Sequence, residues 1–242
     1  MLQKCRGIVL NTINYSENSV VLKCYTDLFG MQSYLINGVK GKKGAIKPSH
    51  LMPLSLLELE VYHQQNKNLQ RIKELRCVPV LNHLHFELHK STLALFMAEL
   101  LTKSLREQDH IDEQMFGFLF HSVQIADLTE GSLRNFPVYF MIQLSKYLGF
   151  FPKANFASKT PVFSLQEGVF VGEAANLSDY CNEPLSAALA QFIDLNFEEI
   201  QRVELPSTLR RDLLNKIIRY YQLHLMLFSE LKSPAVLHEV LN

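Results

Sequence analysis

Apolar and polar residues alternate over the first third of the chain. Up to Pro79, short runs rich in β-branched and aromatic residues are separated by polar turns, such as the one at residues 14–18. In one run Leu57, Leu59 and Val61 occupy every second position, which is the period of a strand with one buried side. The pattern predicts five strands, at residues 5–11, 20–26, 31–39, 56–62 and 69–78.

Beyond these strands the apolar positions follow the period of helices. The first helix, ending near residue 107, carries an apolar stripe, and the longest, at residues 209–231, is ended by Ser233 and Pro234. Between Gly149 and Gly172 the chain is irregular. Further helices are predicted at residues 113–128, 136–148 and 185–197. The apolar stripe of the first helix consists of Leu84, Leu88, Leu95, Phe96, Leu100 and Leu101.

The two patterns together predict an α+β protein with two domains. Five short strands with no long helix between them favour a closed five-stranded barrel of the OB type at residues 1–79, with an SH3-like barrel as the alternative. Residues 80–242 are expected to form an α-helical domain that contains the irregular insertion, at about residues 150–182.

Composition places the chain among ordinary globular proteins. Its 242 residues are 48% hydrophobic and 20% charged, with 10 glycines and 9 prolines, which excludes the collagen-like, low-complexity and disordered classes. No apolar run approaches the ~20 residues of a membrane helix, and the N-terminus lacks the apolar core of a signal peptide. We therefore expect a cytoplasmic protein.

The cysteines predict neither a disulfide framework nor a metal site. Cys5, Cys24, Cys77 and Cys181 are widely spread and form no CxxC pair. This usage is typical of reduced thiols in a cytosolic protein.

The net charge of zero hides an asymmetry between the two halves. Residues 1–80 contain eleven Lys and Arg against five Asp and Glu, a net charge of +6, and residues 81–242 have a net charge of −6. A basic module joined to an acidic one indicates a site for a polyanion on the first module and protein contacts on the second. Chance scatter of charges is the alternative.

The densest group of cations lies in a glycine-containing stretch between the third and fourth strands. Lysine is a mobile point charge, which suits the phosphate backbone of a nucleic acid better than base edges. Strict alternation would put Arg71 and Lys73 on one side of the fifth strand and Arg76 on the other, unless a bulge intervenes. The candidate nucleic-acid-binding residues are Lys4, Arg6, Lys40, Lys42, Lys43, Lys47, Arg71, Lys73 and Arg76; the alternative for the loop is a solvated segment.

Aromatic residues in the same region offer surfaces for stacking. OB barrels stack nucleobases on exposed aromatic rings. The candidates here are Tyr15, Tyr25, Tyr34 and Tyr62, with packing inside the barrel as the alternative.

The sequence contains no specific motif for catalytic chemistry. Gly41 and Lys42 resemble the end of a nucleotide-binding P-loop, but the required glycine spacing and the following Ser or Thr are absent. His85 and His89 are expected on one helix face with Glu87 pointing away, which favours a solvated helix start over a zinc site. The chain also contains no Gly-x-Ser-x-Gly nucleophile motif. These results indicate a protein that is not an enzyme.

Several short motifs resemble those of the RecO family of bacterial recombination mediators. They are Gly7-Ile8-Val9-Leu10, Tyr15-Ser16-Glu17-Asn18, Tyr25-Thr26 followed by Gly30, Gly38-Val39-Lys40, Ala98-Glu99-Leu100, Leu148-Gly149 followed by Pro152, and the terminal segment from Leu231 to Leu237. Their order and spacing cover essentially the whole chain. The resemblance implies an OB domain and a helical domain that bind single- and double-stranded DNA and anneal complementary strands. It also implies contacts with RecR and with the single-stranded-DNA-binding protein, so that RecA can be loaded, and a place on the nucleoid.

The resemblance also implies a site for the acidic, apolar tail of the single-stranded-DNA-binding protein. Such a tail needs an apolar pocket with cations at its rim. Helical spacing puts Arg211 and Arg219 near the same side of the helix at residues 209–231. The candidate partner-binding residues are Arg210, Arg211, Lys216 and Arg219; the alternative is an ordinary solvated helix face.

One feature departs from the family pattern. Many members of the family carry zinc-binding cysteine pairs after the Leu-Gly-x-x-Pro segment, whereas residues 155–180 here contain no cysteine and Cys181 stands alone. We therefore expect no zinc and no other cofactor. Apolar packing is predicted to hold the insertion together through Phe156, Val162, Phe163, Val169 and Phe170.

Two other functions remain open from the sequence alone. An OB barrel with a basic loop does not by itself choose DNA over RNA, so an RNA-binding or ribosome-associated module is one alternative. A cytosolic enzyme with a dispersed active site is the other, and its mark would be a deep pocket with convergent polar groups.

Overall fold

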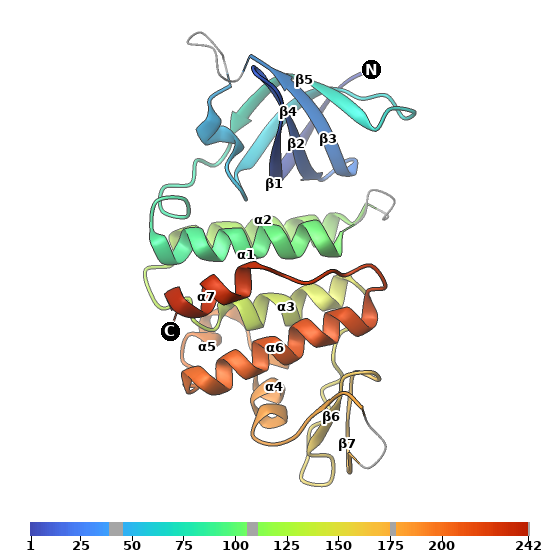
Figure 1. Cartoon of the computed structure of the whole chain (residues 1–242), viewed down its shortest axis with the longest axis vertical. Coiled ribbons are helices and arrows are strands. Elements are labelled where there is room, and N and C mark those ends of the chain that lie inside the picture. Colours follow the sequence, from blue (N-terminus) through green and yellow to red (C-terminus); the bar gives the residue numbers. More distant parts are fainter. Residues whose placement is uncertain (39–45, 106–110, 175–177, 242) are drawn as a thin grey trace. The chain divides into compact units, whose positions relative to one another are not determined.

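The computed structural model describes residues 1–38, 46–105, 111–174 and 178–241. The chain divides into two compact units, Met1–Leu128 and Thr129–Asn242. The first contains a β-barrel and two helices, and the second contains the remaining helices and a small sheet (Figure 1).

The five N-terminal strands form a closed barrel in the order β1-β2-β3-β5-β4 (Figure 1). Strand β1 pairs antiparallel with both β2 and β4, and a short parallel pairing between β3 and β5 closes the barrel. The predicted OB-type barrel and the α+β class are confirmed. The strands are β1 (Leu2–Ser16), β2 (Ser19–Thr26), β3 (Gly30–Asn37), β4 (Leu56–Tyr62) and β5 (Leu69–Cys77).

Strand β1 is longer than the sequence pattern predicts because it serves two neighbours. A bulge between Val9 and Asn11 divides it, and the two parts bend so that β4 and β2 can both pair with it. Before the bulge, a Cβ on Gly7 would lie 3.0 Å from a methyl carbon of Leu59. Glycine thus lets β1 approach the side chain of the opposite strand closely.

The barrel core consists of the alternating apolar residues that the pattern predicts. Leu57, Leu59 and Val61 of β4 are all buried, and they pack with Val9 and Leu22 from β1 and β2. The charged residues between them in β4 point outwards. The two-residue period therefore separates core from surface as expected.

Two helices complete the first unit, α1 (Leu88–Ser104) and α2 (Glu113–Leu128). The predicted stripe of α1 is partly wrong, because Leu88 is 72% and Leu95 is 55% exposed. The apolar residues of α1 are distributed over nearly all sides of the helix, so the sequence pattern does not identify its buried side. The buried side is carried by Leu93, Phe96, Met97, Leu100 and Leu101.

The second unit contains elements that the sequence did not predict. The insertion is not irregular throughout but holds a small antiparallel sheet, in which Phe163 and Phe170 pair and pack at 4.9 Å between ring centroids. Both side chains are buried, as is Val162, which supports the expected apolar packing of the insertion, whereas Phe156 is 37% exposed. The strands are β6 (Val162–Ser164), β7 (Val169–Val171) and β8 (Tyr180–Cys181), in the order β7-β6-β8.

Three helix ends in this unit differ from the prediction. The helix expected to run to residue 197 stops at Ile193, and the longest one stops at His224 instead of residue 231. Ser233 and Pro234 begin a helix and do not end one, because proline is well tolerated in the first helical turn. The helices are α3 (Phe136–Tyr147), α4 (Leu185–Ile193), α5 (Phe197–Ile200), α6 (Ser207–His224) and α7 (Ser233–Leu241). No helix in the described part of the chain has the length and apolar character needed to cross a membrane.

Candidate nucleic-acid interface

Several of the predicted cations lie among carboxylates on the outer surface of β1, β4 and β5. In the strand register Lys4 is opposite Glu60, and Glu60 is opposite Glu74. In the neighbouring row Arg6 is opposite Glu58, which is opposite Arg76. This surface borders a groove of about 490 Å³ lined by Lys4, Cys5, Arg6, Asp27, Glu58, Leu59, Glu60, Glu74 and Arg76. Its charges largely cancel.

Two ion pairs on this surface join cations to carboxylates directly. Lys73 Nζ lies 3.0 Å from a carboxylate oxygen of Glu60, which raises the pKa of the lysine. Arg76 pairs with Glu74, two residues before it on β5. These two cations are engaged within the protein and offer little free charge to a phosphate.

Arg6 is also engaged, between the barrel and α2. Its Nε lies 3.0 Å from Asp27 Oδ2, and its backbone N–H donates to Asp27 Oδ1 at 2.9 Å. Its guanidinium lies 5.1 Å from the ring centroid of Phe116 and 5.5 Å from that of Phe120. Both distances suit cation–π contacts, so Arg6 attaches α2 to the barrel.

A bulge in β5 decides which side chains share this surface. Glu60 pairs with Glu74 and Val61 with Ile72, which leaves Lys73 as an extra residue in β5. The bulge therefore interrupts the alternation, and Lys73 and Arg76 are both exposed. The alternation of residues in the sequence is compatible with a bulge in this strand but does not give its position.

The surface of β2, β3 and the first half of β5 has a different composition. In register, Lys23 is opposite Ser33, and Arg71 is next to both Leu35 and Tyr62. Strands β2 and β3 contain no Asp or Glu. Among the residues that the structure describes, neither Lys23 nor Arg71 forms an ion pair with a carboxylate. Lys23 was not among the predicted residues, although its place between buried Leu22 and Cys24 in a strand pattern would have indicated an outward side chain.

The four tyrosines divide into two classes. Tyr34 is buried in the barrel core, whereas Tyr25 is buried on the outer side of the barrel, where its ring centroid lies 6.2 Å from that of Phe116 in α2. Neither ring is available to a nucleobase, and the stacking expectation is wrong for both. Burial also raises the pKa of Tyr34 above its usual range. Tyr15 is 66% and Tyr62 is 48% exposed. Tyr62 is the more useful platform because it lies opposite Arg71.

The basic loop is described only at its end. Lys40, Lys42 and Lys43 lie outside the described residues. Lys47 lies just before the short 3-10 helix η1 (Pro48–Leu51) and lines a second groove, of about 380 Å³.

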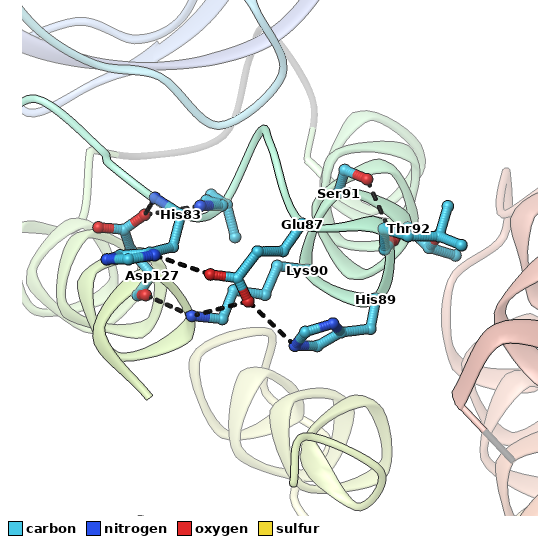
Figure 2. Close-up of polar contacts among 9 residues, drawn as sticks. His83, Glu87, His89, Lys90, Ser91, Thr92 and Asp127 are labelled. Atoms are coloured by element: carbon cyan, nitrogen blue, oxygen red, sulfur yellow. Dashed lines mark hydrogen bonds and ion pairs between the residues drawn. The ribbon is translucent and has the colours of Figure 1, made fainter. Parts of the chain in front are cut away.

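A buried carboxylate holds the linker between β5 and α1. Asp127 Oδ1 accepts hydrogen bonds from the backbone N–H groups of His83 at 2.8 Å and Leu84 at 2.7 Å, and Oδ2 accepts one from Asn82 at 3.2 Å. Burial alone would raise the pKa of Asp127, but these donors together lower it. Figure 2 shows the network, in which Lys90 Nζ also donates to the carbonyl oxygen of Asp127 at 2.7 Å.

The histidines near the start of α1 are not arranged as predicted. Helix α1 begins at Leu88, so His85 precedes it and does not share a helix face with His89. Instead Glu87 contacts His83 at 2.7 Å and His89 at 3.4 Å (Figure 2). Lys90 Nζ lies 3.6 Å from the same carboxylate and would repel a cation there.

The described part of the chain contains no group of three His, Cys, Asp or Glu side chains that could hold a metal ion. Burial raises the pKa of Cys5 to about 12 and that of Cys181 to about 11, which disfavours the thiolate that zinc requires. The absence of zinc stays a prediction.

The predicted basic group on α6 is mostly used within the second unit. Arg219 binds Asp179 with two hydrogen bonds, at 2.8 and 2.9 Å, and Lys216 Nζ donates to the Tyr180 carbonyl at 2.8 Å. Arg210 is buried and donates to the Leu205 carbonyl at 3.2 Å. Arg211 is exposed, with its Nε 4.0 Å from the adjacent Asp212. Of the four predicted residues, Arg211 is best placed to meet a partner.

Comparisons with known proteins agree along the whole chain. The family model described as "Recombination protein O N terminal" matches residues 1–80, and the one described as "Recombination protein O C terminal" matches residues 85–234. A DNA repair protein RecO from Azobacteroides pseudotrichonymphae is 34% identical over 243 residues and covers 100% of both chains. Proteins of the same name from Bacteroides fragilis and Porphyromonas gingivalis are 32% and 27% identical over 100% and 98% of both chains.

Proposed function

Because the chain belongs to the recombination protein O family, which acts in DNA repair and recombination, we propose that it binds DNA and anneals complementary single strands without catalysing a reaction. Residues 1–79 are the proposed DNA-binding domain. Working on chromosomal DNA would place the protein on the nucleoid.

The observation that carries this proposal is the cationic outer surface of β2, β3 and β5. Lys23 and Arg71 lie on this surface, and β2 and β3 contain no Asp or Glu that could neutralise them. Tyr62 lies beside Arg71. In OB folds this side of the barrel binds oligonucleotides. Phosphates would meet the two cations, and a base would stack on the exposed ring of Tyr62.

Annealing requires two polyanions to come together in spite of their repulsion. The lysines of the basic loop, Lys40, Lys42, Lys43 and Lys47, extend the proposed interface with further phosphate contacts. Each phosphate that is neutralised releases counterions, which drives binding and makes it depend on salt. Neutralised strands can then pair with each other.

The proposed role in recombination also includes contacts with other proteins. The protein would act with RecR to load RecA onto DNA coated by the single-stranded-DNA-binding protein. The acidic tail of that protein would contact Arg211 on the exposed side of α6, while Arg210, Lys216 and Arg219 hold the surrounding structure.

Two double variants test the DNA-binding surface. Replacing Lys23 and Arg71 with Ala should reduce the slope of log K against log salt by about 1.4 for single-stranded DNA, because each lost phosphate contact removes about 0.7. The matched control replaces Lys73 and Arg76 with Ala, and its slope should stay close to that of the natural protein because both cations are already paired. Equal slopes for the two variants would contradict the proposed surface.

The function itself is tested by annealing. Complementary oligonucleotides coated with the single-stranded-DNA-binding protein are mixed in buffer containing a chelator, and annealing should be faster with the protein present. A competition between DNA and RNA of one sequence completes the test. Preference for RNA together with no annealing would favour an RNA-binding module.

A further inference from the structure

We infer that the second groove, between η1 and the linker that joins β5 to α1, binds an unpaired nucleotide of single-stranded DNA, with Phe86 as the stacking surface. This inference rests on the proposed DNA-binding function and adds a site to it that lies apart from the β2–β3 surface. The groove has a volume of about 380 Å³, within the range of small-ligand sites.

The walls of the groove are fixed by hydrogen bonds before any ligand binds. On one side Thr12 Oγ1 donates to the carbonyl of Leu51 at 3.0 Å, which ties η1 to β1. On the other side the Asp127 carboxylate holds the linker (Figure 2), and His85 Nε2 donates to the Pro53 carbonyl at 2.8 Å. A preformed site of this kind loses little entropy when it binds.

Two large apolar side chains in the linker are exposed at the groove. Phe86 is 75% exposed and Val80 is 65% exposed, although both line the cavity. An exposed aromatic ring beside a cavity offers a stacking surface to any of the four bases, since every base has a π-face.

Polar groups that can bind the phosphate and the base of a nucleotide line the same groove. Lys47, the last lysine of the basic run, supplies the positive charge for a phosphate, and Ser49 and Asn82 supply hydrogen-bonding groups for a base edge. No Asp or Glu is among the described residues that line it, whereas four carboxylates line the groove on β1, β4 and β5. The contrast in charge favours an anionic ligand here.

A nucleotide fits these features better than an acidic peptide does. Both are anionic, but the position of Lys47 at the end of the basic loop connects the groove with the proposed path of the DNA backbone. The combination of an exposed phenyl ring, a lysine and several hydrogen-bonding groups matches the parts of a nucleotide.

The test uses the absence of tryptophan from the sequence. Phe86→Trp places a single indole at the groove, and the control Leu88→Trp places one two residues later, where the side chain is 72% exposed and does not line the cavity. Each variant is titrated with a dye-labelled oligo(dT), with tryptophan emission and dye anisotropy recorded on the same samples.

The expected result is that saturating oligo(dT) quenches Trp emission in Phe86→Trp and much less in Leu88→Trp. A rise in anisotropy without quenching in Phe86→Trp would overturn this inference while leaving the proposed function intact. No rise in anisotropy for the natural protein would count against the proposed function itself. Quenching by an acidic apolar peptide but not by oligo(dT) would make the groove a protein-docking site.

A second variant measures what the ring contributes. Phe86→Ala should weaken binding of single-stranded DNA by on the order of tenfold and leave binding of blunt duplex nearly unchanged, because paired bases cannot stack on it. An equal loss for both substrates would contradict a role in holding an unpaired base.

Discussion

Lys90 donates a hydrogen bond from its Nζ to the carbonyl oxygen of Asp127 at 2.7 Å, and its side chain is only 3% exposed. The acceptor lies in the last turn of α2, where helix carbonyls lack partners within the helix. A cation at this end also complements the helix dipole. One buried lysine thus joins the start of α1 to the end of α2.

Replacing Lys90 with Met should destabilise the protein by about 1–3 kcal/mol, because it keeps the aliphatic stem but leaves a buried carbonyl without its donor. Urea unfolding of the full chain measures the change. Lys103→Met is the control, since the partly exposed Lys103 pairs at 3.0 Å with Glu99, one turn earlier on the same helix, and an i,i+4 helix pair is worth about 0.3–0.5 kcal/mol. Equal losses for both variants would contradict a special role for Lys90.

The Asp127 carboxylate should make stability depend on pH on the acid side. Its pKa is lowered in the folded protein, so its contribution is complete above the ordinary aspartate pKa and is lost as pH falls through the folded pKa. Asp127→Asn should therefore lower the melting temperature near pH 7 and flatten its decline below pH ~4. Glu58→Gln, at an exposed position of the barrel, controls for the loss of one carboxylate. A parallel decline in Asp127→Asn and the natural protein would contradict the assignment.

The lysines of the basic loop should contribute to DNA binding through charge alone. Replacing Lys42, Lys43 and Lys47 with Ala should flatten the slope of log K against log salt by roughly two units on single strands. Fluorescence anisotropy at several salt concentrations gives the slope. An unchanged slope would remove the loop from the DNA interface.

The chain should bind no zinc when purified. Elemental analysis of the protein after dialysis against metal-free buffer should find far less than one zinc per chain. One zinc per chain would show that ligands exist which the described residues do not reveal.

Arg211 should carry most of the affinity of α6 for an acidic tail peptide. Arg211→Ala should weaken binding of such a peptide several-fold without lowering stability, because its ion pair with Asp212 is long and exposed. Arg219→Ala should instead loosen the contact with Asp179 and the segment before β8. Unchanged peptide binding by Arg211→Ala would move the partner site elsewhere.

The barrel was predictable because polar turns and the two-residue period mark its strands. Strand β1 was predicted too short, because only the three-dimensional pairing reveals that it continues past the bulge near Leu10 to serve β2. Helix ends were less predictable: Pro234 can end one helix or begin another, and only packing decides between them.

The candidate site was less predictable than the fold. Composition counts Arg6, Lys73 and Arg76 as free cations, but each is paired with a carboxylate, and for Arg6 and Lys73 that carboxylate lies on another part of the chain. Such pairs follow from the register of the strands, which a net charge does not contain. The exposure of Phe86 was equally hidden, because it depends on how Asp127 holds the linker.

The bulge at Lys73 has a consequence for how the sequence of this barrel can change during evolution. If Lys73 were deleted, Arg71, Glu74 and Arg76 would still point outwards and Ile72 and Leu75 inwards, because the remaining residues would alternate regularly. The length of β5 can therefore change at this position without exchanging its inward and outward side chains. Among related sequences, insertions and deletions within β5 should gather at this residue, and the charge of the surface should vary with them.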